Sequence, residues 1–173
     1  MQWSIRRKGS IMMLKKWSKV LGVVLAVACV PTALAAEPIK LNCPAGTKQT
    51  SSANGKAADI VACVKTESKG FKPHGPTVYL YSSGAKQAEG MSEDGFRTGL
   101  WTFFDEQGKK TGSASFKRSN FHGEVVELHP NGTVKKVEQY AEGLRHGAAK
   151  EFSADGKLVK QTEYRDNREV ASK

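Results

Sequence analysis

The sequence of 173 residues lacks several patterns that would mark a particular chemistry. No G-x-S-x-G elbow surrounds a candidate nucleophile, and the three cysteines follow neither C-x-x-C spacing nor that of a zinc site. We therefore predict no catalytic residues, no cofactor and no metal site. The apolar run from Val20 to Val30 has 11 residues, fewer than the ~20 that cross a bilayer, so a membrane-spanning helix is not predicted.

The N-terminal 36 residues have the parts of a secretory signal in the required order. Six basic residues precede the apolar run, and Pro31 and a small-residue stretch ending in Ala36 follow it. A charged region, a hydrophobic region and an A-x-A pattern are what export requires. We predict a signal peptide over residues 1–36, cleaved after Ala35 or Ala36.

Two alternatives accompany this signal. Translation starts at Met1 or at Met12 or Met13, since the first eleven residues add nothing that the signal needs. A lipoprotein acylated at Cys29 is the second alternative, although its lipobox would have Ala26 where leucine is usual, and A-x-A cleavage would discard the cysteine. The expected location is periplasmic or extracellular.

Without its signal the chain has little excess charge. The formal net charge of +10 counts 27 basic and 17 acidic residues. Six of the bases and none of the acids lie in the signal, which leaves 21 against 17, a net +4. Nucleic-acid binding is therefore not predicted, and a membrane surface as partner is unsupported. The remaining cysteines, Cys43 and Cys63, are an even pair in an oxidising compartment and are predicted to form a disulfide.

Glycines recur at a spacing of 24 residues, which indicates a repeat. When the sequence is written in rows of 24 residues, two columns of glycines appear without any insertion. Gly75, Gly99, Gly123 and Gly147 begin the rows (the row-head glycines), and Gly84, Gly108, Gly132 and Gly156 stand nine positions later. Two further columns are apolar or mostly aromatic: Leu80, Phe104, Leu128 and Phe152, and Ser92, Phe116, Tyr140 and Tyr164. Four such columns predict a repeating structural unit.

Each row has the pattern of a β-hairpin. A β-rich run leads to a turn that closes on glycine, as in "HPNG" at 129–132 and "SADG" at 153–156, and a second run follows. We predict hairpin tips at the second glycine column and, at the row-head glycines, tight turns between successive hairpins.

Alternation along the first strand of each row separates two faces. We expect the mostly apolar face to be the packed one; it carries Val78, Leu80, Thr102, Phe104, Val126 and Leu128. The other face is aromatic in the early rows and acidic in the later ones, where Glu127 and Glu151 stand.

These features resemble a known repeat family. The pattern Gly-x-Trp-x-x-Phe in "GLWTFF", a turn glycine and a closing aromatic before "GLRHG" resemble the MORN-repeat variant family of bacterial proteins, some of which are labelled YwqK-type antitoxins. The resemblance covers about residues 72–170. It implies a twisted antiparallel sheet that binds proteins or membranes rather than catalyses. Val125 and Ala149 depart from the aromatic at Trp101, and Thr98 interrupts the histidine column.

The predicted fold class is all-β, with an N-terminal cap before the repeats. Four consecutive hairpins over residues 72–173 should form an elongated antiparallel sheet. Residues 37–71 are polar and turn-rich, hold both remaining cysteines, and contain one β-rich run, Ile60 to Val64. We expect this disulfide-stapled cap to cover the first edge of the sheet, because exposed edges invite aggregation.

Two sets of polar residues invite a chemical interpretation. His74, His122 and His146 lie in equivalent positions, which are two strands and roughly 10 Å apart, too far for one zinc ion; we expect structural roles. Glu127 and Glu151 could resemble the pair of catalytic carboxylates of a glycosidase. Because they occupy equivalent positions in the repeat, we favour a solvated acidic stripe that faces lysines. An enzyme is therefore not predicted.

The candidate binding site is an aromatic patch formed by Tyr79, Tyr81, Trp101 and Phe103. The alternation of side chains along a strand places these four residues on one face. Either the patch is a small core beneath the cap, or it contacts a partner, since aromatics dominate interface hot spots. We predict an exported, non-catalytic binding or scaffold module whose partner is a protein at the cell envelope. The alternatives are an immunity or antitoxin-like protein and, third, an envelope hydrolase. Oligomeric state is left open.

Overall fold

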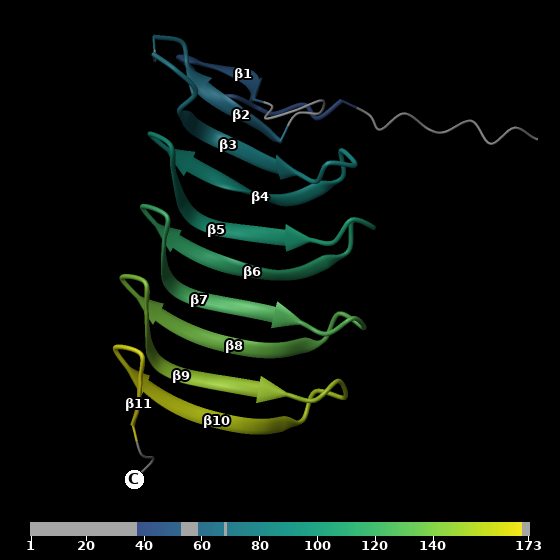
Figure 1. Cartoon of the computed structure of the whole chain (residues 1–173), viewed down its shortest axis with the longest axis vertical. Coiled ribbons are helices and arrows are strands. Elements are labelled where there is room, and N and C mark those ends of the chain that lie inside the picture. Colours follow the sequence, from purple (N-terminus) through teal and green to yellow (C-terminus); the bar gives the residue numbers. More distant parts are fainter. Residues whose placement is uncertain (1–37, 53–58, 68, 171–173) are drawn as a thin grey trace, which may run out of the picture. The chain divides into compact units, whose positions relative to one another are not determined.

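The computed structural model describes residues 38–52, 59–67 and 69–170, and every regular element in these ranges is a strand. Eleven strands form one antiparallel sheet in which each strand pairs with its sequence neighbours (Figure 1). Their bounds are β1 Thr47–Ser52, β2 Ile60–Lys65, β3 Pro73–Leu80, β4 Lys86–Glu93, β5 Phe96–Phe104, β6 Lys110–Lys117, β7 Asn120–Leu128, β8 Val134–Ala141, β9 Leu144–Phe152, β10 Leu158–Arg165 and β11 Arg168–Val170. The predicted all-β sheet of successive hairpins is confirmed.

The predicted signal peptide, with Cys29 and both cleavage positions, lies outside the described residues. Within the described ranges no helix has the length and apolar character needed to cross a membrane.

The hairpin tips lie where the second glycine column predicts them. Each tip is a five-residue loop in which the glycine amide donates to the carbonyl three residues earlier, as from Gly132 to His129 at 2.8 Å. The same bond recurs at Gly84, Gly108 and Gly156. All four glycines have φ between 80° and 88°, a left-handed conformation that glycine adopts without steric cost.

The turns between hairpins are not at the row-head glycines, which corrects the sequence-based expectation. Two-residue turns with positive φ at both positions join the hairpins, at Asp94-Gly95, Arg118-Ser119, Glu142-Gly143 and Asp166-Asn167. This is the type I′ geometry, whose twist matches that of the flanking strands. Asparagine and aspartate tolerate a left-handed backbone more readily than most residues, and Arg118, Ser119 and Glu142 adopt it here as well. The turns therefore form no glycine column.

The row-head glycines instead lie inside the first strand of each hairpin. Gly123, for example, has a φ of 96° within β7. Between β6 and β7 the register shifts from Ala114 opposite Val125 to Phe116 opposite Phe121, so four residues of β7 span two of β6. The glycine absorbs this irregularity through its positive φ. Corresponding shifts occur between β4 and β5 and between β8 and β9.

A repeated backbone bond fastens each hairpin to the next. The second residue of each two-residue turn donates its amide to the residue that stands 22 positions earlier, near the start of the preceding hairpin. These bonds are Gly95 to Pro73, Ser119 to Arg97, Gly143 to Phe121 and Asn167 to Arg145, at 2.8–3.0 Å. Successive hairpins therefore share one backbone connection.

The N-terminal segment adds a hairpin to the sheet. The predicted β-rich run forms β2, which pairs with β3, and the polar residues 47–52 form β1 at the edge. The predicted disulfide joins Cys43 to Cys63, which is fully buried. Gln49 holds the segment before β1, because its side-chain amide accepts from Leu41 and donates to Ile39. Residues 38–52 and 59–65 thus both staple and extend the sheet.

The main buried cluster lies on the face opposite to the one expected. Trp101 is fully buried, with Ala88, Ala114 and Phe116 beside it. On the face predicted to pack, Val78 is buried, whereas Leu80, Thr102, Phe104, Val126 and Leu128 are only partly covered. The expectation counted apolar residues on each face, but one tryptophan buries far more area than a valine or a threonine.

Candidate functional site

Trp101 is the centre of the aromatic side of the sheet. Its ring lies over Gly90 of the neighbouring strand β4, where an added Cβ would come within 2.5–2.6 Å of three ring atoms. The indole Nε1 donates to the carbonyl of Met91 at 3.0 Å. The ring therefore needs a residue without a side chain beneath it, and its one polar atom is satisfied.

A continuous run of ring contacts extends from Trp101 across the sheet. Successive centroids lie 4.9–6.4 Å apart along the series Tyr79, Trp101, Phe116, Phe121 and Tyr140. We call the face that carries these rings and Phe103 the aromatic face. Tilted and edge-on pairs at such distances stabilise a cluster beyond the area that they bury.

Arg97 covers the middle of the aromatic face. Its guanidinium carbon lies 4.9 Å from the ring centroid of Tyr79, 5.1 Å from that of Trp101 and 5.5 Å from that of Phe116. Cations over aromatic rings are attracted by the negative ring faces. Arg145 repeats the arrangement 48 residues later, 4.5 Å from the ring of Tyr164.

An open hollow of about 350 Å³ lies beside this cluster. Phe103, Phe121 and Val125 contribute to its lining, and Gly112 leaves part of it without a side chain. A Cβ at Gly112 would collide with the carbonyl oxygen of Val126, so no larger residue fits there. Phe103, unlike Trp101, keeps part of its surface exposed, so the hollow offers apolar contact area.

Three of the four candidate patch residues come together. Tyr79, Trp101 and Phe103 belong to one packed cluster, and of these three Tyr79 and Phe103 are partly accessible whereas Trp101 is buried. Tyr81 lies in the hairpin loop, and its hydroxyl donates to the carbonyl of Phe104 at 2.8 Å, which links two hairpins. Trp101 is covered by residues of the repeat strands. The aromatic face rather than the four predicted residues is therefore the surface to consider.

Sequence reasoning missed Arg97, Phe116 and Phe121 as members of this face. Arg97 and Arg145 do share a position in alternate rows, which was an available signal. Phe116 lies on the second strand of its hairpin, and its contacts with the next hairpin depend on how the two strands are aligned. The irregularities near the row-head glycines change this alignment, so the contacts could not be predicted from the sequence.

Charged groups replace the rings on the same face toward the C-terminus. Glu138 stands 48 residues after Gly90 and is buried. Its carboxylate contacts Lys136 at 3.0 Å and Arg145 at 3.7 Å. Burial acts against the charge of Lys136, but the hydrogen bond to Glu138 and the neighbouring carboxylates raise the pKa of Lys136 overall.

Acids and lysines alternate across four neighbouring strands of this region. Glu127 pairs with Lys136, Lys136 pairs with Glu151, and Glu151 pairs with Lys160. We call this series the charge ladder. Because a lysine separates the two carboxylates and Glu127 is half exposed beside Lys135, the pair lacks the shielded carboxyl group that a general acid requires.

The histidine column serves the turns between hairpins. His74 Nδ1 lies 3.2 Å from Asp94, and His146 Nδ1 lies 3.1 Å from Asp166. In the same way, His122 lies 3.5 Å from Glu142. Each acid is the first residue of the two-residue turn that follows. The row with Thr98 in place of histidine has Arg118 at that turn position, so the histidine and the acid occur together.

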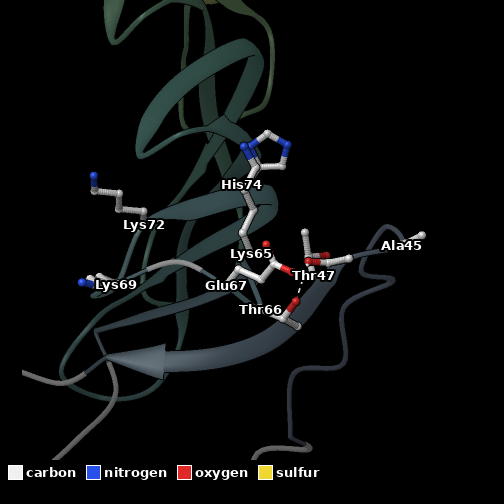
Figure 2. Close-up of a pocket in the computed structure, with 9 residues that line it drawn as sticks. Ala45, Thr47, Lys65, Thr66, Glu67, Lys69, Lys72 and His74 are labelled. Carbon is white, nitrogen blue, oxygen red and sulfur yellow. Dashed lines mark hydrogen bonds between the residues drawn. The ribbon is translucent and has the colours of Figure 1, made fainter.

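A second hollow, of about 600 Å³, lies near the disulfide end. Figure 2 shows the residues that line it, among which Lys65, Lys69, Lys72 and His74 are basic. Their side chains do not converge: Lys69 and Lys72 lie at the left of the view and His74 lies near its centre (Figure 2). Lys65 is already paired with Asp94 at 2.7 Å. The residues therefore form no shared anion site.

The C-terminal row of the chain matches a known family model. Residues 145–166 match the family model described as MORN repeat variant. The matched range runs from Arg145 at the start of β9 to Asp166 in the turn after β10. No curated protein matches the chain.

The matched MORN repeat variant contains the contacts that recur in the other rows. Arg145 covers Tyr164, His146 contacts Asp166, and Gly156 closes the hairpin tip. MORN repeats in a sheet of β-hairpins are consistent with a non-catalytic binding or scaffold module. No group of three or more potential metal ligands occurs in the parts of the chain that the structure describes.

Proposed function

We propose that the protein is an exported, non-catalytic binding module whose partner is another protein of the cell envelope, and that the aromatic face is the contact surface. The observation that carries this proposal is the hollow beside Phe103 and Gly112, at the accessible border of a rigid cluster. Partly exposed aromatic side chains next to a preformed recess are common anchors of protein interfaces.

The rest of the sheet supports a binding role. Trp101 and Arg97 hold the neighbouring rings through packing and ring contacts, so Tyr79 and Phe103 lose little conformational freedom on binding. A preorganised surface binds more tightly because less entropy is lost. The disulfide between Cys43 and Cys63 accords with an oxidising compartment outside the cytosol.

A photo-crosslinking experiment tests the proposal. A benzophenone amino acid is placed at position 103 in one sample and at position 104 in a matched control, in cells that export the protein. Phe103 and Phe104 are adjacent aromatics of β5 that alternate between the two faces and are both partly exposed. We expect position 103 to capture a defined partner and position 104 not to capture it.

Purified components complete the test. Phe103→Ala should weaken binding of the captured partner tenfold or more, about 1.4 kcal/mol or greater, as expected for an anchor residue. Phe104→Ala should have little effect. Equal capture from both positions, or binding that does not depend on Phe103, would contradict the proposed surface. If co-expression of the protein rescues cells from the captured partner, the antitoxin-like alternative replaces a general scaffold role.

A further inference from the structure

The last long strand of the described sheet has an unpaired edge. Strand β11 pairs with β10 at three positions only, Glu163, Tyr164 and Arg165. In the described residues, β10 from Leu158 to Thr162 therefore pairs with β9 on one side, with a register shift at Val159, and with no strand on the other. The positions equivalent to 160–162, which are 112–114 in β6 and 136–138 in β8, pair on both sides. The equivalents of Leu158, Lys110 and Val134, pair only with the preceding strand. We call residues 158–162 the β10 edge.

The charge ladder ends on this edge. Lys160 stands 24 residues after Lys136, and Lys136 pairs with an acid on each side, Glu127 in β7 and Glu151 in β9. Lys160 has Glu151 on its inner side only. The alternation across the strands is thus complete up to Lys160, and a residue opposite its outer side would continue the ladder if it were acidic.

The β10 edge also exposes apolar surface. Leu158 is 53% exposed and Val159 is 68% exposed, and the latter is the most exposed of the large hydrophobic residues in the described chain. The five residues of the edge include one lysine and no acid, and Lys157 precedes them. Unpaired backbone groups beside aliphatic side chains and lysines favour an extended ligand that is acidic and partly apolar.

Charge disfavours a second copy of this chain as the occupant. If two β10 edges paired about a two-fold axis, Lys160 at the centre of each would face Lys160 of the other. The other terminal strand, β1, has the sequence TKQTSS, which contains Lys48 and no acid. Like charges directly opposite one another destabilise strand pairing.

We propose that the β10 edge binds an extended segment of a partner protein as an added antiparallel strand, with an acidic residue of that segment opposite Lys160. Main-chain hydrogen bonds supply much of the affinity in this mode, and side-chain pairing supplies the specificity. The edge is separate from the hollow beside Phe103, and this inference does not depend on the aromatic face.

Strand β9 provides a probe of suitable chemistry. It covers the outer side of β8, where Glu151 pairs with Lys136, Lys150 with Val137 and Ala149 with Glu138. An eight-residue peptide with the sequence of residues 149–156, AKEFSADG, contains these pairing residues and stops short of Glu163, which pairs with β11. It can be added to the full-length exported protein.

Amide hydrogen exchange and peptide titration test the inference. With millimolar peptide, exchange of the amides of residues 158–162 should slow, while those of β6 should not change. Lys160→Glu should weaken peptide binding about five- to tenfold, the effect of replacing a cross-strand ion pair by a repulsion. A peptide with Glu151→Lys should bind the wild type weakly and the Lys160→Glu protein well.

A matched control and two contrary outcomes complete the design. Lys110→Glu makes the same charge change on β6, four strands away from β10 in the sheet order, and should leave the affinity unchanged. The proposal is wrong if saturating peptide leaves exchange at 158–162 unaltered or if Lys110→Glu acts like Lys160→Glu. It is also wrong if the protein alone protects these amides as its concentration rises, because a second copy then occupies the edge.

Discussion

The aromatic and the charged parts of one sheet face share their backbone and differ in their chemistry. Trp101 lies over Gly90 in the first part, whereas in the second part Ala149 pairs with the buried Glu138, 48 residues after these two positions. Phe103 likewise corresponds to Glu151. Hairpin tips, two-residue turns and the bonds between rows are nevertheless the same.

This difference shows which positions define the repeat. The positive-φ positions and the bonds between rows hold every hairpin in the same relation to the next. Side chains on the face can then be apolar or ionic, provided that each buried polar group is paired.

Trp101→Ala should have the largest effect because it empties the centre of the aromatic part. We expect the free energy of unfolding to fall by about 3–5 kcal/mol, the usual loss for a buried tryptophan. Chemical denaturation followed by circular dichroism measures it. As a control, Leu158→Ala at an exposed position should change stability by no more than about 0.5 kcal/mol. A similar loss from both variants would contradict the assigned core.

Gly90→Ala should also destabilise the aromatic part, since the new Cβ would come within 2.5–2.6 Å of the Trp101 ring. Overpacking of this kind typically costs about 1–3 kcal/mol. Thermal unfolding and the fluorescence of Trp101 report the displacement. In a protein that already carries Trp101→Ala, Gly90→Ala should no longer lower the free energy of unfolding. If Gly90→Ala still destabilised the Trp101→Ala protein, the contact with the ring would not be the cause.

Glu138→Gln tests the charged part. It keeps the shape of the side chain but removes the charge that faces Lys136 and Arg145. We expect a loss of about 1 kcal/mol, small because both partners are partly exposed. The loss should shrink in about 1 M salt, which screens exposed charges, whereas the effect of Trp101→Ala should not shrink. Salt-independent behaviour of Glu138→Gln would argue against an ionic role.

The smallest effect concerns the turns that both parts share. A hydrogen bond from Lys65 lowers the pKa of Asp94 below its ordinary value of 3.8, and one from Lys117 lowers that of Glu142 below 4.5. A lowered pKa in the folded state means that the stabilisation is complete above the ordinary pKa and is lost as pH falls through the lowered one.

We therefore expect the temperature of thermal unfolding to decrease as the pH is lowered from about 5 to about 2. Asp94→Asn and Glu142→Gln should each flatten the profile to a similar extent, because each acid begins an equivalent turn. A marked difference between the two variants would show that the turns are not energetically equivalent.

Much of the fold could be predicted because its signals are local. The tip glycines, the run that forms β2 and the pairing of Cys43 with Cys63 all follow from spacing and composition. Strand β1 was missed because its residues, TKQTSS, have no apolar alternation. The two-residue turns were missed because residues such as Arg118 and Ser119 adopt positive φ there without a glycine.

The candidate site was less predictable because it depends on contacts between strands. Parity placed Tyr79, Trp101 and Phe103 on one face, where they do meet. It could not show that Trp101 is covered, that Arg97 lies over three rings, or that a recess opens beside Gly112. These facts depend on side-chain volume and on register shifts between strands.

The period, the hairpin tips and the disulfide pairing follow from local sequence, because glycines at positive φ and the pair of Cys43 and Cys63 restrict the chain over short distances. Three features depend on the tertiary structure: which face packs, that the row-head glycines are irregular strand positions, and that in the described residues the charge ladder ends at a strand without a further neighbour. Burial and strand pairing are sums over residues far apart in the chain, so they become defined only when all the strands are in register.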